Sequence, residues 1–218
     1  MRLCSAALLL PCLATAQPAD RAPAGAVDAG WIIGKLARPA PMRTSFVEVR
    51  ASKLLKNPLR LSGEYLRPRA DTLVRQVRAP YVETTTIVTP KAGAAQATIE
   101  RGGRTRTFSL ARVPELAGLQ ASFCALLAGD RATLERYYRL DPQGTREKWT
   151  LVLVPKDPAM AAQVRGITLH GRGAELRCIE TTAAKGAEVQ RTLLATAARA
   201  VGGASESASL ETLCRDGG

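Results

Sequence analysis

Apolar and polar residues alternate in two stretches of this chain, one on each side of a central segment with helical spacing. In short runs between residues 59 and 110, and again between 149 and 195, every second residue is apolar or glycine. A period of two is typical of strands that bury one face, whereas the apolar residues three and four apart in 115–138 indicate helices. The chain has no strand–helix–strand rhythm. This order predicts an α+β domain built on one large antiparallel sheet, with helices gathered on one side.

Turn and capping residues divide these stretches into elements. Gly102 and Gly103 between two strand patterns predict a tight hairpin, Gly129 ends a helix, and Asp130 begins the next one as its N-cap. The sequence predicts strands at 59–65, 73–78, 81–88, 97–101, 104–110, 149–155, 166–170, 175–182 and 188–195. It predicts helices at 31–36, 115–128 and 130–138, a short helix from Asp157, a turn at 171–173 and a helical turn at 209–213.

Composition excludes several classes of function. The formal net charge is +12, but the basic residues are interleaved and aromatic residues are only 4%, so few side chains could stack on bases. We expect no nucleic-acid partner. With one histidine and no C-x-x-C pair, a His/Cys metal site is hard to build, and we expect no metal and no cofactor. A catalytic triad could use only His170, which we interpret as structural, so we do not expect an enzyme.

The first residues have the pattern of a secretory signal peptide. Arg2 supplies the positive region, residues 3–13 form a short apolar run, and residues 14–16 give a small-residue cleavage site. We expect cleavage after Ala16, a flexible leader over 17–29 and one domain over 30–218. No later segment has the roughly 20 apolar residues that a membrane-spanning helix needs. We therefore expect export and no transmembrane segment.

Three cysteines remain after cleavage, namely Cys124, Cys178 and Cys214. Any two of them could pair, and sequence alone does not decide which. Cys124 lies in an apolar helical pattern where a buried thiol is common. Cys214 lies near the C-terminus, which frays unless it is tied down. We favour a Cys178–Cys214 disulfide, which would contribute about 3–4 kcal/mol of stability.

Four short motifs follow one another between Thr44 and Leu194. They are Phe46-Val47-Glu48, Gly63 to Leu73 with Arg67-Pro68-Arg69, Pro80 to Ile87 with Glu83, and Trp149 to Lys156 ending in Pro155-Lys156. Their order and spacing resemble the LolA/LolB lipoprotein-carrier superfamily of Gram-negative bacteria, and more narrowly its divergent LolA-related branch. Glu48 stands where the family usually has glutamine.

The resemblance implies a half-open β-barrel whose concave face is covered by helices that act as a lid. It implies a periplasmic, monomeric carrier for the acyl chains of a lipoprotein or another lipid, working between an inner-membrane donor and an outer-membrane acceptor. The family's arginine that latches the lid falls on Arg69, with Ala70 in place of the family's proline. A shift of two residues would place it on Arg67-Pro68 instead, so Arg67 is the alternative.

Combined with the alternation, the resemblance yields candidate residues for a lipid cavity and its lid. Any one of these residues is more often part of an ordinary core than of a cavity, so the prediction concerns the set. The strand candidates are Phe46, Leu61, Tyr65, Leu73, Val77, Ile87, Ile99, Phe108, Trp149, Leu151, Leu153, Ile167 and Leu169. The lid candidates are Leu116, Leu119, Phe123 and Leu127.

Two other functions stay open at this point. The same scaffold could serve as a periplasmic lipid-sensing or protein-binding regulator. It could also carry a product of fatty-acid or polyene-type synthesis.

Overall fold

The computed structural model describes residues 26–50, 58–90, 92–112, 114–186, 189–201 and 207–215, without the side chains of 114–120 and 207–209. The expected signal peptide and most of the expected leader lie outside the described residues. Residues 26–29 of that leader belong to the fold, because Val27 is buried and Asp28 caps the first helix through a 2.9 Å bond from the backbone N–H of Trp31.

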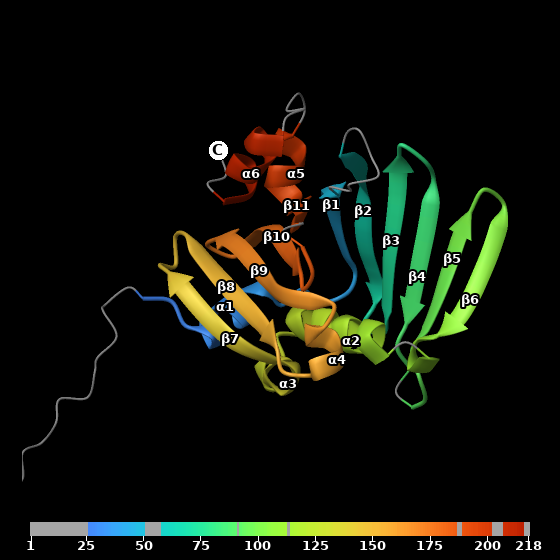
Figure 1. Ribbon diagram of the computed structural model, residues 1–218, viewed down its shortest axis with the longest axis horizontal. Helices are drawn as coiled ribbons and strands as arrows, with labels where there is room; N and C mark the ends of the chain where they lie inside the picture. Colours follow the sequence, from blue (N-terminus) through green and yellow to red (C-terminus); the bar gives the residue numbers. More distant parts are fainter. Residues whose placement is uncertain are drawn as a thin grey trace, which may run out of the picture.

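A single antiparallel sheet of 11 strands forms the body of the protein (Figure 1). The strands are β1 (Met42–Arg50), β2 (Leu59–Arg69), β3 (Thr72–Ala79), β4 (Glu83–Val88), β5 (Gln96–Arg101), β6 (Arg104–Ser109), β7 (Tyr138–Gly144), β8 (Trp149–Pro155), β9 (Val164–Arg172), β10 (Glu175–Ala183) and β11 (Val189–Leu194). They lie in the order β6-β5-β4-β3-β2-β1-β11-β10-β9-β8-β7. The first and last strands therefore pair in the middle, and the sheet remains open between β6 and β7.

The helices cover both faces of this curved sheet. They are α1 (Ala29–Leu36), η1 (Leu110–Arg112), α2 (Pro114–Ala128), α3 (Arg131–Tyr137), α4 (Pro158–Ala161), α5 (Ala195–Ala200) and α6 (Ser207–Arg215). The segment with α2 and α3 joins the two edge strands, and Figure 1 shows α2 between the arm formed by β1–β6 and the arm formed by β7–β11. The expected α+β fold, an open curved sheet with helices, is confirmed.

Besides β1 and η1, which the strand and helix patterns did not include, two further elements differ from the sequence-based expectation. Residues 138–144 form the edge strand β7 instead of a connection, and residues 195–200 form helix α5. Pro142 hides the strand pattern in β7, but an edge strand tolerates proline because one side of it needs no backbone donor. The turn after β9 is Gly173-Ala174, since Gly171 and Arg172 still pair with β10. The Gly102-Gly103 hairpin and the Asp130 cap form as predicted.

Apolar side chains pack on both faces of the sheet. On the concave face, α1, α2 and α3 pack against β7–β9, and a second cluster around Phe46 and Leu61 lies over β1–β3. On the convex face, α5 and α6 pack against Val47, Val49 and Leu193 of the central strands. The seam between β1 and β11 is thus supported from behind, which leaves the concave face of the two arms to form a cavity.

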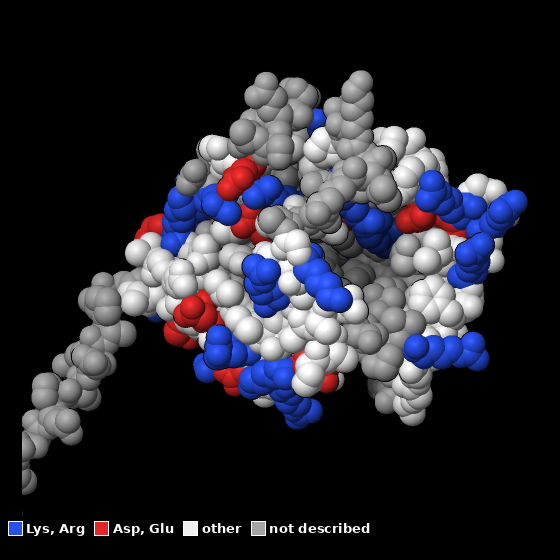
Figure 2. Space-filling model, viewed as in Figure 1, with Lys and Arg blue, Asp and Glu red and all other residues white. Residues whose placement is uncertain are grey.

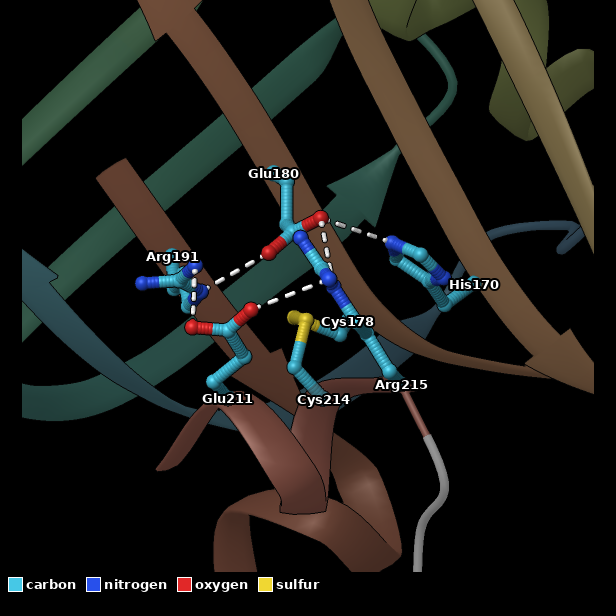
Figure 3. A network of polar contacts seen from close by, with 7 residues as sticks. All are labelled: His170, Cys178, Glu180, Arg191, Glu211, Cys214 and Arg215. Atoms are coloured by element: carbon cyan, nitrogen blue, oxygen red, sulfur yellow. Dashed lines mark hydrogen bonds and ion pairs between the residues drawn. A yellow bond between two sulfur atoms is a disulfide. The ribbon is translucent and has the colours of Figure 1, made fainter. Parts of the chain in front are cut away.

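A disulfide and an ion-pair network attach α6 to the convex face (Figure 3). Cys178 on β10 is joined to Cys214 on α6, and Cys124 takes no part in this bond. Next to it, the Glu180 carboxylate accepts hydrogen bonds from His170 Nε2 at 3.0 Å and Arg191 Nε at 2.7 Å. Arg191 and Arg215 each contact Glu211 at 3.0 Å. His170 thus has a partner on the face opposite the cavity, in keeping with a structural role.

This network predicts a loss of stability in acid. The hydrogen bond from His170, together with that from Arg191, outweighs the effect of burial and lowers the pKa of Glu180 to about 2. Because the folded-state pKa lies below the ordinary 4.5, Glu180 stabilises the fold above about pH 4.5, by about 3 kcal/mol. That contribution should disappear as the pH falls from 4.5 toward 2.

Urea denaturation between pH 7 and pH 2.5 measures this effect. Glu180→Gln should be less stable than the wild type at pH 7 and should flatten the pH curve, so that the two proteins converge in acid. Glu100→Gln, on an exposed position of β5, is the control and should keep the wild-type slope. Parallel curves for the wild type and Glu180→Gln would contradict the assignment.

Candidate functional site

A cavity of about 380 Å³ lies between the concave face of the sheet and the helices α2 and α3. We call it the inner cavity. Its wall is mainly apolar on the side of the helices, where Ser122 and Tyr138 add two hydroxyl groups, and it carries charged groups on the side of the sheet. The lining residues are Glu48, Arg50, Tyr65, Leu73, Arg75, Thr85, Ile87, Ser122, Phe123, Leu126, Leu134, Tyr138, Leu153, Ile167, Leu169, Ile179, Thr181, Gln190 and Thr192. Its volume is within the range of small-molecule sites.

A second cavity of about 470 Å³, the side cavity, adjoins the first on the other side of α2. Tyr65, Phe123, Leu126 and Ile179 line both spaces. The rings of Tyr65 and Phe123 lie 6.1 Å apart and belong to the partition. Figure 2 shows the molecule hollowed between the two arms of the sheet. A change in the position of Phe123 would therefore join the two cavities.

The C-terminal end of α2 is fixed to the sheet by one buried arginine. Gly129 has φ +73°, which allows the chain to turn after the helix. The carbonyl of Leu127 accepts hydrogen bonds from the backbone N–H of Arg38 at 2.9 Å and from Arg67 Nη1 at 3.1 Å. Arg67 Nη1 also donates to the carbonyl of Arg38 at 2.6 Å. Arg67, on β2, thus joins the sheet, the segment after α1 and the end of α2.

Arg69, the first choice for this role from sequence, has different partners. Its side chain is 68% exposed and bonds to Asp71 and Thr72 of its own hairpin. The pairing of β2 with β3 shifts register between Leu66 and Arg69. Such an irregularity changes the direction of the side chains that follow it. This accounts for the different surroundings of two arginines that are two residues apart on one strand.

Comparison with known families decides the relationship. Residues 21–217 match the family described as outer membrane lipoprotein carrier protein LolA-like. The chain belongs to this LolA-like family. A comparison with curated protein sequences gives no significant match. Solved structures similar to this LolA-like chain include a LolA superfamily protein from Nitrosomonas europaea, with 8% identity, 76% of this chain and 90% of that chain covered and a TM-score of 0.39. They also include LprF from Mycobacterium bovis, with 14% identity, the same coverages and a TM-score of 0.33.

The predicted cavity residues of this LolA-like protein fall into several groups. Seven line the inner cavity, namely Tyr65, Leu73, Ile87, Phe123, Leu153, Ile167 and Leu169, and Leu127 lines the side cavity. Five pack in the core of the concave face without lining either cavity, namely Phe46, Leu61, Val77, Trp149 and Leu151. Ile99 and Phe108 lie half-buried on β5 and β6, away from both cavities. Leu116 and Leu119 lie on α2, where side chains are outside the described residues.

The core residues are explained by their position in the sheet. Trp149 lies over Gly171 on the neighbouring strand, where an added Cβ would come within 2.0 Å of the indole ring. Its Nε1 donates to the carbonyl of Gly173 at 3.0 Å. A residue can thus face the concave side and still be covered by α1 and its neighbours. Alternation identifies the face but not which part of that face the helices leave open.

The LolA-like cavity also has a charged end that the apolar patterns did not predict. Glu48 is 2% exposed, and its Oε2 lies 3.0 Å from Arg75 Nη2. Its Oε1 accepts a hydrogen bond from Arg50 Nε. Burial raises the pKa of the neighbouring Tyr65 hydroxyl, and Arg75 partly offsets this. The only sequence signal for this cluster was the glutamate at a position where the family usually has glutamine.

Two observations bear on other chemistries. His170, Glu180 and Cys214 offer metal-ligand atoms within 4.8 Å of one another. However, the Cys214 sulfur is in the disulfide and Glu180 is paired with Arg191, so these residues do not fit a metal ion. Within the described ranges, no helix is both long and apolar enough to cross a membrane.

Proposed function

We propose that this protein is a periplasmic carrier that holds the acyl chains of a lipoprotein or a lipid in the inner cavity and takes them toward the outer membrane. The observation that carries the proposal is the mainly apolar cavity between the concave face of the sheet and α2 in a chain of the LolA-like carrier family. The protein's own apolar side chains leave this space open, although closely packed interiors have few large voids.

The energetics of burial agree with a lipid cargo. Each CH₂ group removed from water contributes about 0.8 kcal/mol, so even half of a long acyl chain supplies several kcal/mol. The wall next to α2 and α3 includes the apolar side chains of Phe123, Leu126, Leu134 and Leu153, beside the hydroxyl-bearing Ser122 and Tyr138. These apolar side chains favour apolar ligands in general. They make no specific polar contacts that would select one particular acyl chain. A family of chains with similar length would therefore bind.

In this proposal α2 is the lid and Arg67 is its latch. The Arg67 side chain is buried and holds the Leu127 carbonyl, whereas Arg69 makes contacts within its own hairpin. Entry of a chain past Phe123 requires α2 to move relative to β2. The latch sets the free energy of that movement, because its hydrogen bonds must break when the helix leaves.

Mass spectrometry of the protein exported to a periplasm and purified without detergent tests this function. Native spectra should contain an adduct that denaturing spectra lack, and lipid extraction should identify acylated molecules in a stoichiometric amount. A bare protein that also fails to take up fatty acids or phospholipids would overturn the carrier proposal. It would favour a regulator that binds another protein on this scaffold.

A charge introduced into the partition between the two cavities should prevent binding. Phe123→Glu would place a carboxylate in apolar surroundings, and we expect at least a tenfold loss of bound lipid in the native spectra. Ala128→Glu, on an exposed position of the same helix, is the matched control and should keep its lipid. If both variants bound equal amounts of lipid, α2 would not be part of the binding site.

A further inference from the structure

Ser122 and Tyr138 add only hydroxyl groups on the helix side of the inner cavity, whereas its charged groups gather on the side of the sheet. The Cα partners Glu48 and Thr192, on the paired strands β1 and β11, lie there together with Thr181 and Gln190, which are partners across β10 and β11. Arg50, the last residue of β1, also lines this side. The cavity therefore has an apolar part and a polar part, as an amphiphilic ligand requires.

The apolar side chains of α2 lie toward the opposite end of β1. Tyr65 pairs with Thr44 near the start of that strand, and its ring lies 6.1 Å from the ring of Phe123 on α2. A strand of nine residues spans about 26 Å. A chain whose tail lies against Phe123 and Leu126 of α2 would thus point its headgroup toward Arg50. Figure 2 shows basic atoms at the upper margin of the hollow between the arms.

Arg75 is already engaged in this cluster. Its Nη2 lies 3.0 Å from Glu48, its Nη1 lies 3.9 Å from Glu83, and its guanidinium lies 4.8 Å from the centre of the Phe46 ring. Burial lowers the pKa of Arg75, but Tyr65 and Glu48 outweigh it and the pKa is raised. Arg75 is therefore a fixed cation that orients Glu48 and has little capacity for a further partner.

Arg50 differs from Arg75 in the hydrogen-bond donors that its side chain can still offer to a ligand. Its Nε bonds to Glu48, but neither of its Nη atoms has a partner in the part of the chain that the structure describes. The side chain is 46% exposed, so it can move toward a ligand. Around the cluster, the carboxylates of Glu48 and Glu83 face the guanidinium groups of Arg50, Arg75 and Arg101, which leaves one positive charge in excess.

We infer that the inner cavity takes an acyl chain with a free anionic headgroup, a carboxylate or a phosphate, which the Nη groups of Arg50 bind at the polar end. Arginine binds both of these groups through paired, charge-assisted hydrogen bonds. An acyl chain esterified to an uncharged group has no charge at its polar end and would leave Arg50 without this partner. The inference rests on the proposed function and specifies the class of its ligand.

Matched amphiphiles test the headgroup. Delipidated protein is titrated with hexadecanoate, hexadecyl phosphate, methyl hexadecanoate and hexadecanol, each below its micellar concentration, by displacement of a fluorescent fatty-acid analogue. We expect at least one anion to bind tenfold or more tightly than the neutral molecule of the same chain length. The two anions distinguish a carboxylate from a phosphate as the natural headgroup.

Arg50→Gln should reduce this ratio to near one, through a loss of affinity for the anions. Arg50→Lys should restore part of the preference. Arg78→Gln is the control, because it also removes one arginine from the first arm but lines neither cavity, and it should keep the wild-type ratio. Far-UV circular dichroism and the urea midpoint establish that each variant is folded.

The outcomes separate this inference from the function on which it rests. Equal binding of anionic and neutral chains by the wild type would overturn the headgroup assignment and leave the acyl carrier intact. A preference for anions that persists in Arg50→Gln would also overturn it. No binding of any of the four molecules, together with no extracted lipid, would overturn the carrier function itself.

Discussion

Replacement of Arg67 by alanine is expected to lower the free energy of unfolding by about 3–5 kcal/mol, because hydrogen bonds to a charged group contribute about 1.5–3 kcal/mol each. Arg67 donates to the carbonyls of Arg38, Leu127 and Ala70 at 2.6, 3.1 and 3.3 Å. Its removal leaves carbonyl groups at the end of α2 with fewer partners. Urea denaturation measures the loss, and hydrogen exchange should show that the amides of α2 lose protection before those of the central strands.

Arg69→Ala is the matched control for this prediction. It removes the same side chain from the same strand, but the side chain is exposed and its bonds within the described part of the chain are to Asp71 and Thr72 of its own hairpin. We expect a change in stability below about 1 kcal/mol, as is usual for exposed pairs. If Arg69→Ala released α2 and Arg67→Ala did not, the latch would belong to Arg69 after all. Lipid release should be faster from the Arg67→Ala variant than from the Arg69→Ala variant.

The second large effect concerns the disulfide. Its cysteines are 36 residues apart, and in the chain-entropy model the closure of such a loop contributes about 4 kcal/mol. The double variant Cys178→Ala/Cys214→Ala should therefore unfold at a much lower urea concentration. Reduction of the wild type with a thiol should give the same shift, since both treatments release the same loop.

Cys124→Ala controls for the loss of a cysteine elsewhere, since Cys124 lies outside the bond, and we expect a much smaller shift. Because Cys214 lies on α6, the double variant should first loosen the helices on the convex face. Its affinity for lipid, measured under conditions where it is still folded, should remain near that of the wild type. A large loss of affinity without unfolding would show that the convex face communicates with the cavity.

The sheet could be predicted from sequence because the strands that bury one face keep a period of two. Leu151, Leu153, Ile167 and Leu169 follow this period, and they pack together on the face that α1, α2 and α3 cover. The edge strand β7 escaped prediction although Tyr138, Leu140 and Pro142 alternate with exposed residues, because the run is short, contains a proline and has only Tyr138 fully buried. Hydrophobic periodicity reports burial, and an edge strand has little of it.

The division between core and cavity could not be predicted. Leu151 and Leu153 lie two residues apart on one strand and face the same side, but only Leu153 lines the inner cavity. The difference depends on where α1, α2 and α3 cover the sheet, which is a property of the tertiary arrangement. The charged end of the cavity could not be predicted for a related reason. Glu48 and Arg75 are far apart in the sequence and meet only through the pairing and curvature of the sheet.

The connection between the two open edges has a mechanical consequence. The segment that contains α2 and α3 is attached to β6 at one end and to β7 at the other, while β1 and β11 hold the arms together at the middle of the sheet. An increase in the distance between the edges must therefore pull on both ends of the same segment. The two arms therefore cannot move apart without displacing α2. The length of the segment between β6 and β7 then limits how far the two edges of the sheet can separate. It therefore also limits the width of any cargo that can enter between them.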